Sequence, residues 1–297
     1  DILTADLREL LQDTFMGGGV GFVPFASPFT GFRQTIKTTS KGWTPYNIMQ
    51  RKSVPQPYVG DFFVSGWVAR PAAGASTRWE MSSKRRHLEE CSRARLLFIC
   101  REAARIAITL NDGEERIFEF EADDVVRQIV VEEEHISSLE MKILSGEAGF
   151  TGIGADFDSK EGVAVDNFSI RSNNGQAMFW SSAAVNAQIH TMRAYDLVIL
   201  QYGLNIMQAD RHNYSLYGRG GNPRNGRERP LTARRAGHSA YVVGRGSYGL
   251  TARGGREVRR IVLEHLRGYA AYGWYDPLCG EWLGRQGLHT HQLCRWP

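Results

Sequence analysis

Hydrophobic and polar positions alternate through much of the first half of the chain, as they do in half-buried β-strands. Aliphatic residues alternate with smaller or polar ones over 104–110, and Phe118 and Phe120 then alternate with glutamates. Asn111, Asp112 and Gly113 lie between the two runs, and these residue types tolerate the positive φ angles of a tight turn. The pattern predicts a β-hairpin over residues 104–122.

Further short segments of strand type occur before and after this hairpin. They are the residues FFVSGWVA (62–69), RARLLFIC (93–100), VVRQIVVEE (125–133), LEMKIL (139–144) and GVAVDNFSIRS (162–172). Several short strands at this spacing are typical of an antiparallel β-sandwich. We therefore predict a β-sandwich over residues 34–158.

Helical periodicity occurs on both sides of this region. Leucines recur at helical spacing over Thr4–Phe15, with Thr4 as the expected N-cap, and residues 16–32 read as an irregular Gly/Pro-rich loop. A second helical segment covers 176–194, and the near-continuous apolar run YDLVILQYGLN (195–205) follows it. Such a run is typical of a buried parallel strand. The order predicts a three-layer α/β/α domain with a parallel sheet, interrupted by the inserted sandwich.

Composition indicates a globular protein without a transmembrane helix. Of the 297 residues, 42% are hydrophobic and 23% are charged, which is ordinary for a soluble domain. The apolar runs are much shorter than the roughly 20 residues that span a bilayer. Four cysteines are too few for a disulfide scaffold; Cys91 and Cys100 either form a disulfide or remain as buried free thiols.

The balance of basic and acidic residues changes sharply near residue 218. Residues 1–218 carry 22 basic and 27 acidic residues, whereas residues 219–297 carry 14 arginines, no lysine, five acidic residues and 14 of the 32 glycines. Four interpretations of this tail are open: a nucleic-acid-binding arm, a zinc site, translation out of frame, or a genuine but unusual end of a domain. The zinc interpretation would use Cys279, His289, His291 and Cys294, whose spacing matches no standard ligand set.

Candidate catalytic residues lie at the ends of two strands in the predicted parallel sheet. One predicted strand ends at Gly175 and the next ends at Asn205. In open α/β sheets, sites form at the carboxyl ends of strands. A backbone N–H at Gly175 and the side-chain amide of Asn205 are the donors that an oxyanion hole requires. Gly and Asn are also common turn residues, so the pattern alone leaves both interpretations open.

The segments VDNFSIRSNNG (165–175) and YDLVILQYGLN (195–205) resemble the second and third conserved blocks of SGNH (GDSL-type) hydrolases. The order of parts is similar to peptidoglycan and carbohydrate O-acetylesterases that carry an inserted β-sandwich. The resemblance implies an exported serine esterase that acts on a carbohydrate or cell-wall glycan, most simply by removing an acetyl group. It implies no cofactor, and it places Gly175 and Asn205 in the oxyanion hole.

Two parts that the resemblance leads us to expect are missing from the sequence. It contains no Gly-Asp-Ser, and no Asp-x-x-His follows residue 218. Residues 1–15 resemble the helix that follows the serine, so we expect the serine block just before Asp1. The final residues Gly287–Pro297 can be encoded so that a displaced frame reads Asp-Tyr-Thr-His. We therefore predict a frameshift near residues 217–222 and a chain that is inactive as given.

The resulting domain assignment has four parts. Residues 1–33 begin the hydrolase domain, 34–158 form the inserted sandwich, 159–218 continue the hydrolase domain, and 219–297 are out of frame. A second hypothesis makes the protein a non-catalytic carbohydrate-binding protein in which Trp67, Trp79 and Tyr58 stack on sugar rings; the alternative is that these aromatics fill the core. The expected partner is a glycan, without nucleic acid and without a membrane span.

Overall fold

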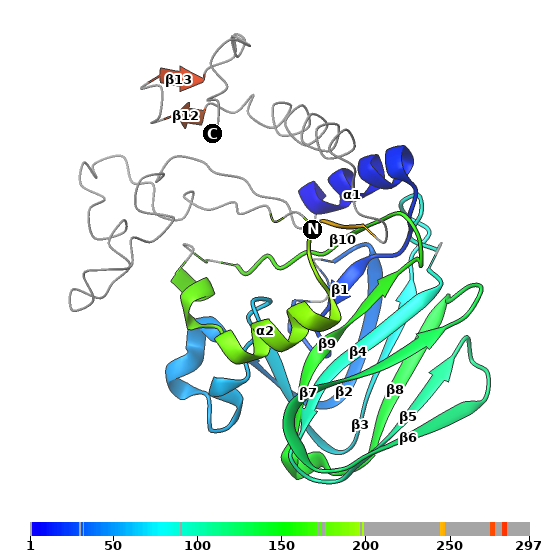
Figure 1. Ribbon diagram of the computed structural model, residues 1–297, viewed down its shortest axis with the longest axis vertical. Coiled ribbons are helices and arrows are strands. Elements are labelled where there is room, and N and C mark those ends of the chain that lie inside the picture. Colours follow the sequence, from blue (N-terminus) through cyan, green and yellow to red (C-terminus); the bar gives the residue numbers. More distant parts are fainter. Residues whose placement is uncertain are drawn as a thin grey trace. The chain divides into compact units, whose positions relative to one another are not determined.

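A computed structural model of the protein describes residues 2–29, 31, 33–89, 91–171, 173, 176–196 and 198, together with three short strands beyond residue 240 (Figure 1). The chain divides into two compact units. The first contains residues 1–198 and 243–251, and the second contains 199–242 and 252–297. The fold and the sites below belong to the first unit.

A nine-stranded antiparallel sheet makes up most of the first unit. Its central order is β6-β5-β8-β3-β9-β4-β7, with β1 paired to β9 and β2 paired to β3. The strands are β1 (Gly21–Val23), β2 (Ile36–Asn47), β3 (Trp67–Met81), β4 (Arg93–Cys100), β5 (Ala104–Leu110), β6 (Glu115–Phe120), β7 (Asp123–Glu132), β8 (Ser138–Ser145) and β9 (Phe150–Asp158). The described strand pairs are all antiparallel.

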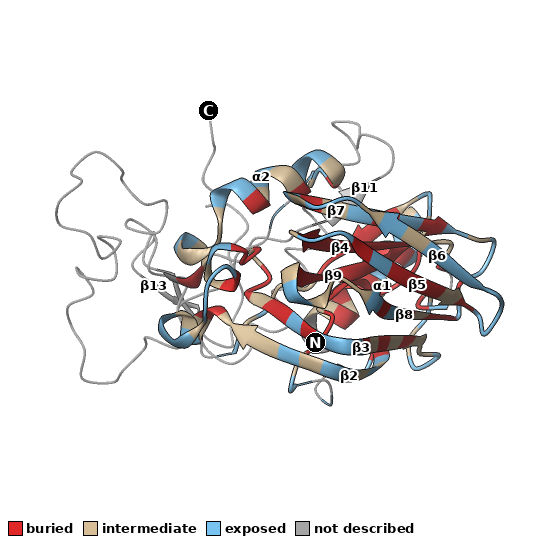
Figure 2. Ribbon diagram, turned by 90° about the horizontal axis from the view of Figure 1, so that it is seen from below, coloured by how far each residue is buried: buried red, intermediate tan, exposed pale blue. Residues whose placement is uncertain are grey.

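The sheet curves around one large hydrophobic core. The long strand β3 pairs with β8 through its second half and with β9 at Ala69, so the two layers of the sandwich connect through it. Figure 2 shows β2 and β3 on one side, β4 and β7 on the other, and buried residues between them. Trp79 and Phe98 are fully buried in this core. Cys91 and Cys100 are also buried there as free thiols.

Strand β4 explains why one sequence segment is continuously apolar. Leu96 and Phe98 point into the main core, whereas Leu97 and Ile99 belong to a second cluster on the opposite face. The helix α2 (Ala183–Met192) contributes Val185 and Ile189 to this second cluster. A strand that is buried on both faces needs apolar side chains at every position, so the period of two disappears.

The predicted hairpin is confirmed. Strands β5 and β6 pair from Ala104↔Phe120 to Thr109↔Glu115. Asn111 and Asp112 have φ angles of 51° and 56°, so both central turn residues are left-handed. The side chain of Asn111 also accepts hydrogen bonds from the backbone N–H groups of Ser137 and Ser138. The turn therefore also connects the hairpin to the start of β8.

The N-terminal segment differs in two details from the prediction. Helix α1 spans Ile2–Phe15, so Thr4 lies inside the helix and is not its N-cap. The Gly/Pro-rich segment also contains a strand, because Gly21–Val23 form β1 and pair with Ala155–Phe157 of β9. Single-sequence patterns do not detect so short a strand, because its partner strand lies far away along the chain.

The predicted α/β/α fold with a parallel sheet is wrong. The first unit is an antiparallel β-sandwich with few helices, and β1 joins the same sheet as the predicted insert. The predicted strand over 162–172 is shortened to β10 (Val163–Val165), which pairs antiparallel with β11 (Gly244–Gly246). The apolar run 195–205 lies largely outside the described residues.

The predicted out-of-frame segment 219–297 also lies outside the described residues, apart from β11, β12 (Trp274–Asp276) and β13 (Glu281–Leu283). Strands β12 and β13 form an antiparallel pair. Among the described residues, no helix is both long enough and apolar enough to cross a membrane.

Candidate functional site

The two expected oxyanion donors, Gly175 and Asn205, lie outside the described residues, so the oxyanion hole stays a prediction. The four residues of the zinc interpretation lie outside them as well. Within the described part of the chain, no group of three or more His, Cys, Asp or Glu side chains is arranged to hold a metal ion.

The three aromatic residues suggested for sugar stacking have different environments. Trp79 is completely buried and packs against Phe25 and Phe157, so it belongs to the core. Tyr58 is 5% exposed and packs on Tyr46. Trp67 is half-buried, and its ring meets the edge of Phe29 at a centroid distance of 6.0 Å. Of the three, Trp67 is the one whose side chain is not buried.

A second group of aromatic residues was missed by the sequence analysis. The 3-10 helix η5 (Gln176–Trp180) ends in Phe179, which is 57% exposed, and Trp180, which is half-buried. The guanidinium of Arg51 lies 4.0 Å from the centre of the Trp180 ring. This cation–π contact holds the indole in place while part of it remains accessible.

Both groups of aromatics lie where β2 ends and β3 begins. Asn47, the last residue of β2, pairs with Trp67, the first residue of β3. Ile170 packs in one cluster with Trp180 and Tyr46, and it also fills the space beside Gly66. A Cβ atom on Gly66 would lie 2.3 Å from Ile170, and the residue has a φ of 71°, so glycine is required there. We call Phe29, Tyr46, Trp67, Phe179 and Trp180 the aromatic end.

Polar contacts fix the loops of the aromatic end to the sheet. Asp61, at the end of the 3-10 helix η3 (Tyr58–Gly60), accepts two hydrogen bonds from Arg101 at 2.7 and 2.9 Å and one from Thr151 at 2.7 Å. The N–H of Ser182 donates to the carbonyl of Phe62, which holds η5 and α2 against the same loop. The loops that carry the aromatic side chains are therefore hydrogen-bonded to the sheet and to each other.

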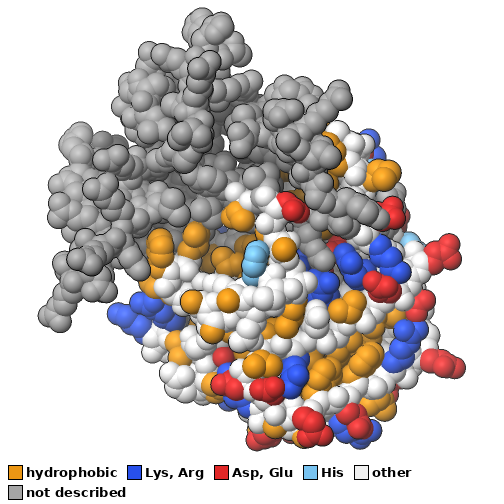
Figure 3. All heavy atoms as spheres, viewed as in Figure 1, with side chains coloured by type: hydrophobic (Ala, Val, Ile, Leu, Met, Phe, Trp, Pro, Cys, Tyr) orange, Lys and Arg blue, Asp and Glu red, His pale blue; other side chains and the backbone are white. Residues whose placement is uncertain are grey.

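Basic side chains lie near the aromatic end, where Arg51 and Arg171 contact the rings of Trp180 and Phe29. Arg51, Lys52 and Arg70 form no ion pair with any described carboxylate. Burial raises the pKa of Tyr58, and the nearby Arg70 opposes that shift. Figure 3 shows that, on the face seen in Figure 1, hydrophobic side chains are exposed between acidic and basic ones. Accessible rings with nearby guanidinium groups can stack on a ligand and donate hydrogen bonds to its oxygen atoms.

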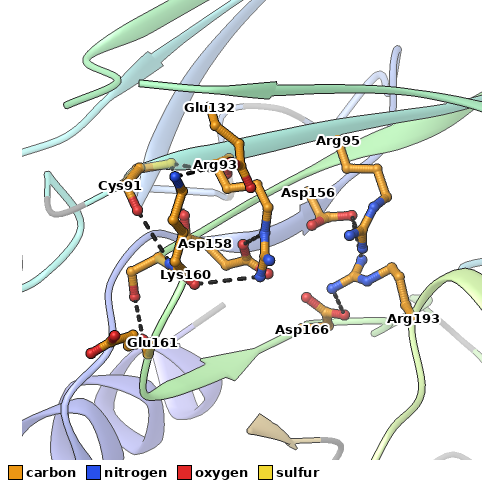
Figure 4. A network of polar contacts seen from close by, with 12 residues as sticks. Cys91, Arg93, Arg95, Glu132, Asp156, Asp158, Lys160, Glu161, Asp166 and Arg193 are labelled. Atoms are coloured by element: carbon orange, nitrogen blue, oxygen red, sulfur yellow. Dashed lines mark hydrogen bonds and ion pairs between the residues drawn. The ribbon is translucent and has the colours of Figure 1, made fainter. Parts of the chain in front are cut away.

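A buried ionic network lies apart from these aromatics (Figure 4). Arg193, which is fully buried, points between Asp156 and Asp166, with nitrogen–oxygen distances of 3.0 and 2.5 Å. Asp166 also accepts hydrogen bonds from the N–H of Phe22 and the hydroxyl of Tyr195, both at 2.8 Å. Each oxygen of its carboxylate thus accepts at least one hydrogen bond.

The pKa values in this network shift in different directions. Burial raises the pKa of Asp156 to about 6, although Arg193 opposes the shift. For Asp166, burial is outweighed by Arg193 and Tyr195, which together lower the pKa of the carboxyl. Burial also raises the pKa of the Tyr195 hydroxyl. Asp166 is therefore a buried structural anion and is not placed to act as an acid or base on a ligand.

The network connects three segments that are distant in sequence. Asp166 follows β10, Phe22 lies in β1, and Arg193 and Tyr195 follow α2. Polar residues of α1 are also turned inward, since Arg8 and Gln12 lie one turn apart and donate to the backbone carbonyls of Val165 and Val163. Both are 1% exposed, whereas Leu10 is 36% exposed. The inner face of α1 therefore combines the expected leucines Leu7 and Leu11 with two polar side chains, while Leu10 is partly exposed.

Comparisons with known proteins give fold similarities at low identity. No protein-family model matches the sequence. No curated protein matches it either. A solved peptidoglycan O-acetylesterase is 16% identical and has a TM-score of 0.45 over 62% of this chain. The match covers 47% of the esterase, so it spans about half of that protein's length.

Two carbohydrate-binding modules are also similar. The family 32 module of NanJ from C. perfringens, solved with galactose, is 12% identical with a TM-score of 0.25, covering 41% of this chain and 99% of the module. The module TmCBM61, solved with β-1,4-galactotriose, is 11% identical with a TM-score of 0.28, covering 46% of this chain and 97% of the module. The solved structures similar to this chain thus include an esterase and several sugar-binding sandwiches.

Proposed function

We propose that this protein binds a carbohydrate chain at the aromatic end. One observation carries the proposal: Phe179 and Trp180 are accessible on a short helix that is fixed to the sandwich, and Arg51 holds the Trp180 ring. Aromatic rings offer a flat apolar surface at little conformational cost, and Trp and Arg are the residue types that dominate binding energy. The ligand we propose is a glycan of a cell surface or cell wall.

Glycan binding by the 297-residue chain tests this proposal. We expect binding to polysaccharides in affinity electrophoresis or calorimetry, and at least about a tenfold loss of affinity in Trp180→Ala and in Phe179→Ala, because each substitution removes a stacking surface. Ile117→Ala is the matched control, since Ile117 is 49% exposed on β6, outside the aromatic end. Equal affinity of all four proteins, or no binding to any glycan, would contradict the proposal.

A second candidate function is ester hydrolysis on such a glycan. It is supported by the Asp166 network, which holds the beginnings of the two segments, 165–175 and 195–205, that resemble hydrolase blocks. The sequence itself contains neither Gly-Asp-Ser nor a C-terminal Asp-x-x-His. We therefore propose ester hydrolysis for an exported form of the protein that contains the serine and the Asp-x-x-His. In that form, Gly175 and Asn205 would be the oxyanion donors.

Two measurements separate the candidates. The chain as given is expected to release no acetate from an acetylated glycan, and serine-dependent release would contradict that. Sequencing the source DNA from upstream of codon 1 to the stop codon tests the rest. A Gly-Asp-Ser block before Asp1 and a frame change near codon 218 would support the esterase. An intact frame without a serine block would leave glycan binding alone.

A further inference from the structure

Arg8 is a buried cation whose outer nitrogens have nothing to bind. The residue lies on the inner face of α1 and is 1% exposed. Its Nε donates to the carbonyl oxygen of Val165 at 3.0 Å. Its Nη1 and Nη2 are inaccessible to water and have no hydrogen-bond partner among the described residues. Leaving charged donors buried and unpaired is costly, because they lose their hydration without replacement.

Arg33 presents the same situation beside Arg8. The side chain as a whole is half-buried, but its Nε and Nη2 are inaccessible and unpaired among the described residues. Burial and the neighbouring Arg33 lower the pKa of Arg8 to about 9, and burial lowers the pKa of Arg33 to about 10. The positive charge of Arg33 therefore adds to the cost of the buried Arg8 guanidinium.

The carboxylates nearby do not neutralise this pair. Asp166 attracts both arginines from a distance, but its oxygens already accept hydrogen bonds from Phe22, Arg193 and Tyr195. Asp156 faces Arg193 at 3.0 Å and Arg95 at 3.7 Å. The carboxylates of Asp156 and Asp166 thus already face other cations or donors, and neither forms an ion pair with Arg8 or Arg33.

We propose that Arg8 and Arg33 form a binding site for a small carboxylate. Arginine matches a carboxylate better than any other residue, because its planar fork of N–H donors pairs with both oxygens of the anion. Four unpaired nitrogens on two neighbouring guanidinium groups supply enough donors for both oxygens. A bound carboxylate also offsets part of the positive charge of this pair. Surface arginines such as Arg51 need no such ligand, because water solvates them.

This site is independent of the aromatic end, and its test does not depend on glycan binding. The melting temperature of the full chain is measured while sodium acetate replaces sodium chloride at constant ionic strength. We expect the melting temperature to rise by about 3–6 °C for each tenfold increase in acetate above half-saturation. Arg8→Gln and Arg33→Gln are expected to abolish the rise. Arg105→Gln is the matched control, because it removes an exposed arginine that pairs with Glu119.

Equilibrium dialysis with radiolabelled acetate gives a second measurement, which does not depend on how stable the Arg8 variant is. Wild type and Arg105→Gln are expected to bind one acetate per chain, and Arg33→Gln is expected to bind none. No bound acetate in the wild type, or the same amount bound by wild type and Arg33→Gln, would overturn the site. An equal acetate response of the melting temperature in all four proteins would overturn it as well.

Discussion

At the scale of the residue, Asp156 and Asp166 show that hydrogen bonds determine the pKa of a buried carboxyl. Both carboxyls are buried, and both face Arg193. Asp166 accepts three hydrogen bonds and its pKa is lowered, whereas Asp156 lacks such donors and its pKa is raised to about 6. Hydrogen bonds to the charged form thus separate two carboxyls that share one cation.

The raised pKa of Asp156 predicts a pH dependence of stability. The folded state holds this proton up to about pH 6, whereas the unfolded chain releases it near pH 4. Stability therefore falls as the pH rises from 4 to 6, by up to about 3 kcal/mol, and this contribution is constant above pH 6. Urea unfolding of wild type and Asp156→Asn between pH 4 and 7 measures it.

The variant cannot ionise at position 156, so the wild-type stability should fall relative to that of Asp156→Asn across this interval. Glu119→Gln is a control, because Glu119 is exposed on β6. If the difference between wild type and Asp156→Asn is constant from pH 4 to 7, or increases, the assigned shift is wrong.

At the scale of the element, the β5–β6 turn depends on the side chain and backbone conformation of Asn111. Asn111 holds a φ of 51° and accepts hydrogen bonds from two backbone N–H groups of the segment that leads into β8. It also donates to the carbonyl of His135 at 2.7 Å. One side chain therefore sets the turn and ties the hairpin to the next strand of the sheet.

Asn111→Ala should destabilise the protein by about 2–4 kcal/mol, because it adds backbone strain and leaves the two N–H groups unpaired. Asn111→Gly loses the same hydrogen bonds but accepts the positive φ, so it should cost about 1 kcal/mol less than alanine. Chemical denaturation of the three proteins measures the difference. Equal stabilities of the alanine and glycine variants would show that the backbone conformation contributes nothing.

Local pattern predicted this hairpin because its two strands and its turn follow one another directly along the chain. It failed at residues 162–172, where the alternation predicts a strand but the ladder ends at Val165. There the carboxylate of Asp166 binds the backbone N–H of Phe22, 144 residues earlier. No periodicity reveals a partner at that distance. The predicted oxyanion residues Gly175 and Asn205 lie outside the described residues, and the aromatic end was suggested through Trp67 alone.

The same limit explains the error in fold class. Helical segments beside a β-rich region resemble an interrupted α/β domain, but β1 adds to the edge of β9 and α2 covers the outer face of β4 and β7. Both elements are parts of the sandwich. Their roles depend on tertiary contacts, which cannot be inferred from the order of elements along the chain.

At the scale of the whole molecule, the described hydrophobic clusters lie within the segment Asp1–Val198. Beyond this segment, the first unit gains the short pairing of β11 with β10. The aromatic end and the Arg8–Arg33 pair lie within the same segment. These positions predict that Asp1–Val198 carries the fold and both proposed sites without the arginine-rich segment.

A protein truncated after Val198 should therefore fold, with a melting temperature within about 5 °C of the full chain, since one short strand pair adds little to such a core. Circular dichroism and thermal unfolding check the fold, and affinity electrophoresis checks glycan binding. Retained binding would place the function in the sandwich.

Nucleic-acid binding by the full chain that weakens with salt and is lost on truncation would instead assign a function to the arginine-rich segment. Failure of the fragment to fold would show that the core needs the part of the chain after Val198.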